Sequence, residues 1–351
     1  MQHNLGVARR SAPNSRVWAI VKANGYGHGL DRAMRGFAQA DGMALIEIAD
    51  AIQLREWGWT KPILLLEGAF QASDMQAIMA HQLHIVVHSV EQIAMLELMP
   101  AGPPVDVYLK VNSGMNRLGL LPNIARAAYA RLKSLAVVRS VSLMTHFANS
   151  YAIGTAHPGI TVAEQVCRFS KVAEGLDCER SLADSATVLT NHETAADWVR
   201  PGVMLYGTTV FPGRRGAEFD LRSAMTLESE IISIQLIAPG DSVGYGGRFV
   251  AVRPMTIGVV ACGYTDGYPR PPHDGTPILV DGVKTGVVGR VSMDSVTVDL
   301  TPIPSAHIGS KVTLWGQGLP IEVVAASAGT IACELMCGLS HRIKIVDDHT
   351  G

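Results

Sequence analysis

Short apolar runs alternate with helix-forming segments from residue 17 to about residue 203, and this alternation constrains the fold more than any other feature. Eight runs rich in Val, Ile and Leu have the length of buried strands. They lie at 17–21, 42–46, 63–67, 83–87, 105–111, 139–145, 181–184 and 198–202. Apolar strands joined by crossover helices predict a parallel sheet covered on its outside. Eight such units predict a compact (β/α)8 TIM barrel, with a doubly wound open sheet as the alternative.

The segments between these runs carry signals for helix starts. Ser73 with Gln76, and Ser89 with Gln92, have the spacing of a capping box ahead of apolar periodicity. We therefore expect capped helices to begin near both serines.

The texture of the sequence changes after about Met225. The runs become β-rich and are broken at short intervals by Pro, Gly and Asp, with turn dipeptides such as Asp281-Gly282. Only residues 322–339 suggest helix. We expect two domains, a barrel over residues 1–224 and a mostly-β domain over residues 225–351.

Composition limits the kinds of partner. The chain is 48% hydrophobic with a net charge of −2, and its 29 basic residues are scattered, so neither disorder nor a nucleic-acid surface is expected. No apolar stretch reaches the roughly 18 residues of a membrane span, and residues 1–16 lack the apolar middle of a signal peptide. The five cysteines are odd in number and lack zinc-like pairing, which favours reduced thiols. We expect a cytoplasmic protein with a small-molecule substrate and no metal site.

Chemically active side chains stand at the ends of the predicted strands. In such a barrel, residues just past the carboxyl end of each strand line one mouth, where catalysis takes place. Lys22 follows five apolar residues, and desolvation of an amine favours Schiff-base chemistry, although a solvated loop lysine is an equal alternative. His146 ends the sixth strand and Arg200 lies on the eighth, so we expect them at the same mouth.

A phosphate site is expected beside Lys22. Ser185 and Gly202 belong to the ends of strands seven and eight, where barrels often hold phosphate through backbone N–H groups. A Schiff-base lysine opposite a phosphate site indicates pyridoxal 5'-phosphate. A dinucleotide loop is not supported, because Leu30 occupies the position of the third glycine in "GYGHGL", and no P-loop motif occurs.

Nine motifs have the order and approximate spacing seen in the alanine racemase family. They are "AIVKANGYGHG", "LKVNSGMNRLG", "MTHFA", "SLADSA", "VRPGVMLYG", "VGYGGRF", "GYTDGYPR", "GRVSMD" and "CELMCGLSHRI". The chain resembles this family over essentially its whole length. The resemblance implies a fold-type III, pyridoxal-phosphate-dependent isomerase that interconverts L-alanine and D-alanine, for peptidoglycan or alanine catabolism. It also implies a homodimer with shared active sites, and a first strand segment expected before Met1.

The resemblance assigns roles around the cofactor. Lys22 forms the Schiff base, Arg200 faces the ring nitrogen, and His146 stacks on or beside the ring. The residues implied to bind the phosphate are Tyr26, Ser185, Gly202 and Val203.

Other residues are implied to act on the substrate. Arg117 contacts the cofactor's phenolic oxygen and the substrate carboxylate, and Lys110, often carbamylated in the family, holds Arg117 in place. Tyr245 is the second base and reaches in from the other subunit. The residues implied to shape the entrance and bind substrate from that same side are Tyr264, Arg270 and Met293.

These roles have a chemical rationale. A guanidinium does not yield a proton at neutral pH, so Arg200 keeps the ring nitrogen unprotonated, which limits side reactions. Stereoinversion needs acid–base groups on opposite faces of a planar intermediate, and Lys22 and Tyr245 supply them. A free phenol has a pKa near ~10, so a cation such as Arg117 must help it act as a base.

Two positions depart from the family pattern. Asp184 stands where asparagine is usual, and a carboxylate near a phosphate is unfavourable unless it points away. Cys333 stands where many members carry a tyrosine that crowds the substrate methyl and touches the phosphate. Losing that phenol predicts a weaker phosphate site and tolerance of side chains larger than methyl, such as that of serine.

Four alternatives stay open at this point. A serine or broad-specificity racemase of the same fold fits Cys333. A fold-type III decarboxylase fits less well, because "VGYGGRF" carries the tyrosine that racemisation requires. A non-catalytic pyridoxal-phosphate carrier would need only the barrel, and an aldolase-type Schiff-base barrel would need no cofactor.

Overall fold

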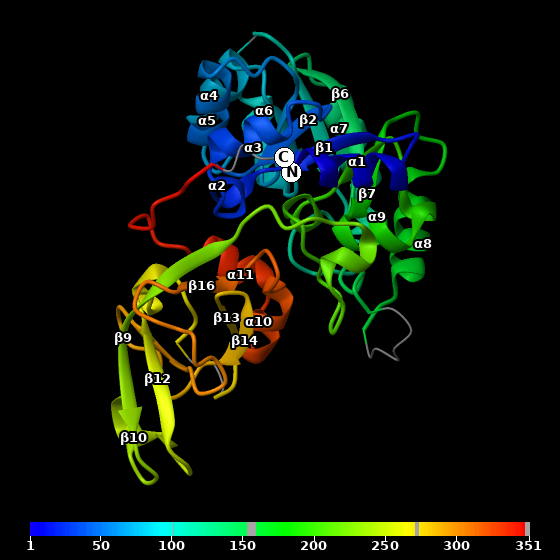
Figure 1. Ribbon diagram of the computed structural model, residues 1–351. Coiled ribbons are helices and arrows are strands. Elements are labelled where there is room, and N and C mark those ends of the chain that lie inside the picture. The colour runs from blue at the N-terminus through cyan, green and yellow to red at the C-terminus, as the bar shows by residue number, and fades with distance from the viewer. Residues whose placement is uncertain (101, 153–158, 271–273, 348–351) are drawn as a thin grey trace. The chain divides into compact units, whose positions relative to one another are not determined.

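The computed structural model describes residues 1–100, 102–152, 159–270 and 274–347 (Figure 1). Contacts divide the chain into two compact units. The first is Met1–Leu205 with Phe219–Leu221, and the second is Tyr206–Glu218 with Arg222–Gly351. The first unit is a parallel barrel and the second is an antiparallel β domain.

Eight parallel strands of the described residues close into a barrel in chain order. They are β1 (Arg16–Ile20), β2 (Gly42–Leu45), β3 (Ile63–Leu65), β4 (His84–Val87), β5 (Val105–Lys110), β6 (Val138–Met144), β7 (Arg180–Asp184) and β8 (Trp198–Arg200). The ring closes where Arg16 pairs with Trp198 and Val17 with Val199. This confirms the predicted (β/α)8 barrel and excludes the open sheet, which would leave two strand edges unpaired.

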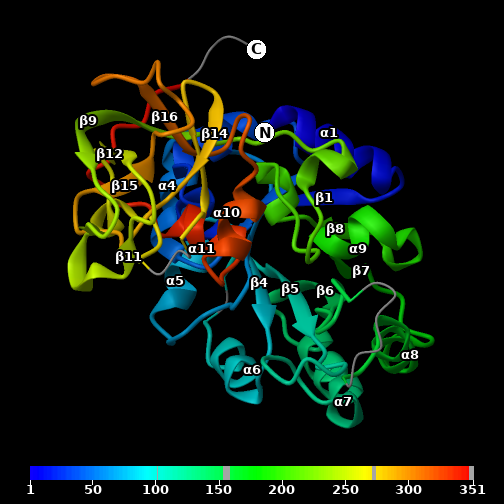
Figure 2. The ribbon, with the colours of Figure 1, turned by 60° about the horizontal axis from the view of Figure 1, so that its bottom comes forward.

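Helices cover the outside of the barrel, and Figure 2 shows α6, α7 and α8 outside β4, β5 and β6. The helical elements of this unit are α1 (Gln2–Ser11), α2 (Lys22–Tyr26), α3 (Leu30–Gly36), α4 (Ile48–Glu56), α5 (Asp74–Ala80), α6 (Val90–Glu97), α7 (Pro122–Lys133), α8 (Val162–Ala173) and α9 (Ser185–Thr190), with 3-10 turns at η1 (His192–Thr194) and η2 (Val203–Tyr206). Among the helices of the described residues, none is long and apolar enough to cross a membrane.

The two predicted helix caps have different outcomes. Ser89 caps α6, because its hydroxyl accepts a hydrogen bond from the backbone N–H of Gln92 at 3.3 Å. α5 begins at Asp74, directly after Ser73, as predicted, but Ser73 makes no side-chain cap, so that part of the prediction is wrong. The Asp74 carboxylate instead accepts from the backbone N–H groups of Phe70 and Gln71, which orders the approach to the helix without Ser73.

Aromatic side chains fill the interior of the barrel. Trp18 of β1 stacks on Trp198 of β8 with ring centroids 4.2 Å apart. Tyr108 of β5 and His84 of β4 meet Trp18 edge-on, at 6.0 and 5.7 Å. The interior is therefore a packed core, and chemistry is confined to the loops at the mouth.

The second unit is built on a six-stranded antiparallel sheet of described residues, in the order β14-β13-β16-β9-β12-β15, and Figure 1 shows β9 beside β12. A separate hairpin pairs β10 with β11. The Asp281-Gly282 turn joins β13 to β14 with φ of 48° and 79°, as a two-residue hairpin loop requires. The bounds of the elements are β9 (Leu227–Ile237), β10 (Ser242–Val243), β11 (Phe249–Val250), β12 (Met255–Val260), β13 (Pro277–Val280), β14 (Val283–Gly286), β15 (Val296–Asp299), β16 (Lys311–Trp315), α10 (Ile321–Ser327) and α11 (Ala332–Cys337), with 3-10 turns at η3 (Gly216–Phe219), η4 (Tyr245–Gly247) and η5 (Tyr264–Asp266).

Candidate functional site

Lys22 follows β1 at the carboxyl end of the barrel, with a partly exposed side chain. The turn after it is left-handed, with φ of 53° at Ala23, 52° at Asn24, 60° at Gly25, 51° at Tyr26 and 78° at Gly27. Each non-glycine residue in this conformation costs about 1–2 kcal/mol. The Gly25 N–H donates to the Val21 carbonyl at 2.9 Å, so a closed hydrogen-bonded turn offsets part of this cost directly beside the amine.

The imidazole of His28 stabilises this turn by hydrogen bonds to its backbone. Its buried imidazole lies with Nδ1 3.1 Å from the Gly25 carbonyl and 3.0 Å from the Tyr26 carbonyl, so Nδ1 carries the proton and donates. Burial lowers the pKa of His28 to about 4, outweighing the two carbonyls, which favour the charged form. His28 is therefore a neutral residue that supports the turn.

A pH dependence of stability follows from His28. Its pKa lies below the unfolded value of about 6.5, so the unfolded chain binds the proton more readily. The free energy of unfolding should hold above pH 6.5, fall by up to ~3 kcal/mol between pH 6.5 and 4, and level off below. In urea titrations followed by tryptophan fluorescence, His28→Asn should show a shallower pH slope than wild type, and an unchanged slope would contradict the assignment.

Ser185, at the start of α9, faces the backbone after β8. Its buried hydroxyl accepts from the N–H of Gly202 at 2.8 Å and from that of Met204 at 3.4 Å. A Cβ on Gly202 would lie 2.6 Å from the Tyr26 hydroxyl oxygen, so a larger residue there would displace the Tyr26 side chain. Val203 is buried in the same segment. The four residues predicted to bind phosphate are therefore neighbours, brought together from the ends of β1, β7 and β8.

The carboxylate of Asp184 is hydrogen-bonded within the protein. One carboxylate oxygen accepts from the Thr187 backbone N–H at 3.0 Å and caps α9, while the other accepts from the Ser150 hydroxyl at 2.8 Å. Asparagine would keep the oxygen that caps the helix. The carboxylate is therefore held by the N-terminus of α9 and Ser150.

Arg200, the last residue of β8, is buried. Its guanidinium donates to the Ser181 hydroxyl at 2.6 Å and to the carbonyls of Thr145 and Leu182 at 2.5 and 3.1 Å. Burial lowers the pKa of Arg200 to about 10, while Asp184 favours the charged form. The side chain stays protonated at neutral pH, and its planar fork is fixed by two acceptors on β7 and one directly after β6.

Positive charge accumulates around the mouth. Lys110 ends β5 and is buried, and desolvation together with the charges of Arg200 and Arg117 lowers its pKa to about 8. His146 follows β6, where desolvation lowers its pKa to about 4 despite the opposing charge of Asp184. Arg117 is exposed on the loop after β5. This cationic surrounding favours an anionic ligand and a neutral imidazole at His146.

A buried glutamine that the motifs do not mark fixes the loop carrying His146. Gln165 of α8 donates to the His146 carbonyl at 3.2 Å and accepts from the Ala148 N–H at 2.8 Å. It also donates to the Ser113 hydroxyl at 3.1 Å, on the loop that leads to Arg117. A polar residue on the apolar face of a predicted amphipathic helix is the sequence signal for such a tether.

Tyr245 lies in the second unit, in η4 between β10 and β11. Its side chain is 72% exposed. The glycines on either side have φ of 72° and 69°, so the tyrosine stands on a tight turn of residues that leave its backbone uncovered. An exposed phenol on such a turn can be offered to another surface.

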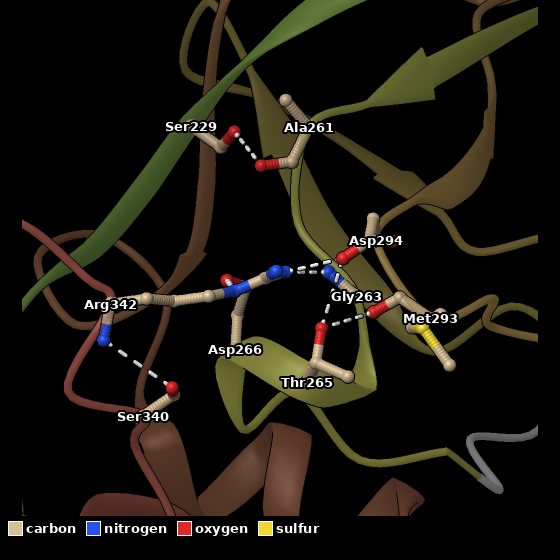
Figure 3. Close-up of polar contacts among 9 residues, drawn as sticks. All are labelled: Ser229, Ala261, Gly263, Thr265, Asp266, Met293, Asp294, Ser340 and Arg342. Atoms are coloured by element: carbon tan, nitrogen blue, oxygen red, sulfur yellow. Dashed lines mark hydrogen bonds and ion pairs between the residues drawn. The ribbon is translucent and has the colours of Figure 1, made fainter.

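Three further predicted residues lie on two adjacent loops of this unit, and Figure 3 shows Met293 of one loop beside Gly263 and Thr265 of the other. Tyr264 begins η5, and its N–H donates to the Ser292 carbonyl at 3.1 Å, which places it beside Met293. The guanidinium of Arg270 lies 5.8 Å from the centre of the Tyr264 ring. Tyr264 and Met293 are both exposed, so the structure joins these three side chains into one surface.

Cys333 lies in α11 and is partly exposed. Within the described residues, no group of three or more His, Cys, Asp and Glu side chains is placed to hold a metal ion. The structure thus forms one cluster at the barrel mouth from Lys22, Tyr26, Lys110, His146, Ser185, Arg200, Gly202 and Val203, with Arg117 on the adjoining loop. A second cluster in the other unit contains Tyr264, Arg270 and Met293, with Tyr245 and Cys333 on separate elements.

Models of two protein families match successive parts of the chain. Residues 1–210 match the model described as the N-terminal domain of alanine racemase, and residues 224–346 match the C-terminal domain of alanine racemase. Together they account for nearly all of the sequence.

Similar curated proteins are named alanine racemase. The chain is 58% identical to the alanine racemase of Janthinobacterium sp. (strain Marseille) over 348 residues, covering 99% of this chain and 96% of the relative. It is 49% identical to that of Burkholderia mallei (strain SAVP1), covering 98% and 96%.

Solved structures agree with the sequence comparisons. The biosynthetic alanine racemase from Pseudomonas aeruginosa superposes with a TM-score of 0.94 at 41% identity, covering 97% of this chain and 94% of that one. The alanine racemase from Acinetobacter baumannii gives 0.91 at 34% identity, covering 97% and 95%. Fold, family models and relatives confirm the resemblance seen in the nine motifs, and the chain is an enzyme that belongs to the alanine racemase family.

Proposed function

We propose that this enzyme interconverts L-alanine and D-alanine with pyridoxal 5'-phosphate as its cofactor. The observation that carries the proposal is the single cluster formed by Lys22 after β1, the Tyr26–Ser185–Gly202 contact and the guanidinium of Arg200. An amine, a backbone segment packed closely against the Tyr26 hydroxyl, and a fixed cation lie at one barrel mouth. The relatives named alanine racemase support the choice of substrate.

The residues present fit the cofactor. A phosphate would be held by Tyr26, Ser185 and the backbone at Gly202 and Val203, in surroundings made cationic by Arg200. When bound, pyridoxal phosphate supplies an electron sink that makes the α-proton of an amino acid removable. Arg200, held by three acceptors, would present toward the ring nitrogen a donor that stays protonated at neutral pH. His146 is held neutral for a place beside the ring.

Two side chains move the proton. Lys22 serves one face of the substrate α-carbon and Tyr245 serves the opposite face, so that one removes the proton while the other returns one. Arg117 binds the substrate carboxylate and favours loss of the phenolic proton. Lys110, whose pKa is lowered to about 8, presents enough neutral amine to accept carbon dioxide, and the resulting carbamate orients Arg117.

The active enzyme is a homodimer in which each barrel receives Tyr245, Tyr264, Arg270 and Met293 from its partner. Support comes from the exposure of Tyr245 and from exposed apolar side chains on the β domain, with Leu236 82% and Val252 88% exposed. Large exposed apolar side chains in a group are typical of protein interfaces. The enzyme acts in the cytoplasm, and D-alanine serves peptidoglycan synthesis or alanine catabolism.

The direct test is a chiral amino-acid assay. Purified protein is incubated with pyridoxal phosphate and L-alanine, L-serine or a larger L-amino acid, and both enantiomers are measured over time. L-alanine should approach an equal mixture of its enantiomers. If every amino acid tested keeps its configuration, the proposed function is wrong.

Cys333 should widen the substrate range. A thiol is smaller than a phenol, so wild type should racemise serine with a kcat/KM nearer to that for alanine than Cys333→Tyr does, by roughly tenfold for a gain or loss of one contact of this size. The ratio of the two kcat/KM values is the measurement, with Cys337→Ser as control. An equal ratio in wild type and Cys333→Tyr would contradict the hypothesis.

A further inference from the structure

The two loops that carry Tyr264 and Met293 are joined by backbone hydrogen bonds. The N–H of Thr265 donates to the Met293 carbonyl at 3.1 Å, and the Thr265 hydroxyl donates to the same carbonyl at 2.8 Å. Gly263 packs so closely that a Cβ there would clash with the Met293 carbonyl. Any movement of one loop is therefore transmitted to the other.

The guanidinium of Arg342 binds a carboxylate on each loop, and we call this arrangement the clamp (Figure 3). Arg342 donates through Nε to Asp266 Oδ1 at 2.6 Å and through Nη2 to Asp266 Oδ2 at 2.9 Å. The same Nη2 donates to Asp294 Oδ1 at 2.7 Å. Asp266 closes η5, and Asp294 directly follows Met293, so Arg342 joins one end of each loop.

The Asp266 carboxylate links this clamp to the backbone before Tyr264. Its Oδ2 also accepts from the Gly263 N–H at 2.8 Å. The backbone carbonyl of Asp266 accepts from the Ser340 N–H at 3.1 Å. Hydrogen bonding to Arg342 lowers the pKa of Asp266, and the two carboxylates raise that of Arg342. The clamp therefore spans three chain segments and stays charged at neutral pH.

An isolated ion pair on the surface contributes little to stability, but Arg342 binds two carboxylates at once. A bidentate guanidinium–carboxylate pair fixes orientation as well as distance, and a second carboxylate on the same guanidinium makes a network. The carboxylate of Asp266 is mostly covered, with 14% of its side chain exposed. The fork geometry, which lysine lacks, is the feature that fixes the loops.

We propose that Arg342 is a positioning residue that sets the relative placement of Tyr264 and Met293 and thereby the affinity for substrate. The proposal rests on the proposed function, in which these two side chains face the substrate. The guanidinium of Arg342 binds Asp266 and Asp294, so its proposed effect passes through the two loops. Its loss should raise KM and leave kcat nearly unchanged, because the proton-transfer groups are elsewhere.

Two variants and one matched control test the clamp. Arg342→Lys keeps the charge without the fork, and Arg342→Ala removes both. Lys311→Ala is the control, since it breaks an exposed ion pair to Glu228 (2.7 Å) in the same unit, away from both loops. Amide hydrogen exchange of the cofactor-free protein at residues 263–267 and 292–294 is measured first, followed by KM and kcat of the loaded enzyme.

The expected results are ordered. Exchange at these amides should quicken by about tenfold in Arg342→Ala and less in Arg342→Lys, with no change in the control. KM should rise roughly tenfold and roughly threefold respectively, with kcat within about twofold of wild type. Unchanged exchange, or faster exchange with an unchanged KM, would overturn the proposal. An inactive wild type would refute the proposed function instead, while the exchange data still report on the clamp.

Discussion

Replacing Lys22 with alanine is expected to abolish racemisation and covalent cofactor attachment together, with a loss of activity of at least ~10³-fold, because one amine performs both tasks. The variant should fold, since Lys22 is partly exposed and the turn that follows is held by the backbone and His28. Circular dichroism would check this before the chiral assay is run on both alanine enantiomers.

Borohydride reduction followed by peptide mass spectrometry provides an independent measurement. In cofactor-loaded wild type the label should fall on Lys22, and in Lys22→Ala no lysine should carry it. Lys61→Ala is the matched control, because the Lys61 amine donates to the carbonyls of Ala38 and Ala40 and is not at a strand's carboxyl end. Racemisation that survives in Lys22→Ala would overturn the mechanism.

Tyr245→Phe is expected to lower racemisation by about 10²–10⁴-fold in both directions, since neither direction can be completed without an acid–base group on each face. The change removes only a hydroxyl from an exposed side chain, so the fold should not respond. In heavy water the Lys22 face remains functional. One alanine enantiomer should therefore exchange its α-proton for deuterium without inverting, while the other should exchange slowly.

Proton NMR of both enantiomers measures this asymmetry. Tyr151→Phe, which alters another exposed tyrosine, should behave as wild type. Equal exchange of both enantiomers in Tyr245→Phe would mean that Lys22 or water serves both faces, and the two-base mechanism would be wrong.

The sequence predicts the barrel closely because the barrel depends on a local pattern. Each apolar run became a strand with bounds within a few residues of those predicted, and the texture change near Met225 precedes the antiparallel sheet. Caps were less predictable. Ser73 and Ser89 have the same spacing to a glutamine. Only Ser89 caps, because its backbone is extended (φ −143°, ψ 163°), as an N-cap requires, whereas that of Ser73 is helical (φ −64°, ψ −25°).

The sequence predicts which side chains gather at the barrel mouth, but it does not predict the backbone turn and the hydrogen bonds that hold them there. Strand ends indicate Lys22 and Arg200, because the carboxyl ends of parallel strands meet. The left-handed course of residues 23–27 was not expected, since only two of its five residues are glycines. Gln165 and Arg342 were also missed as tethers. Arg342 binds carboxylates far away in the sequence and leaves no local pattern, whereas the one signal for Gln165 is its place as a polar residue on the apolar face of α8.

The seam where the barrel closes has a consequence for the folding chain. Lys22 leaves the first strand and Gly202 follows the last, and these strands pair through Arg16–Trp198 and Val17–Val199. Contacts between residues so distant along the chain form late, when most of the entropy of the chain has been lost. A chain that has folded its first seven strands has Lys22 but lacks the Gly202 segment of the proposed phosphate site. A ligand that needs both binds only closed barrels, so it stabilises completed molecules and gives no advantage to unfinished ones.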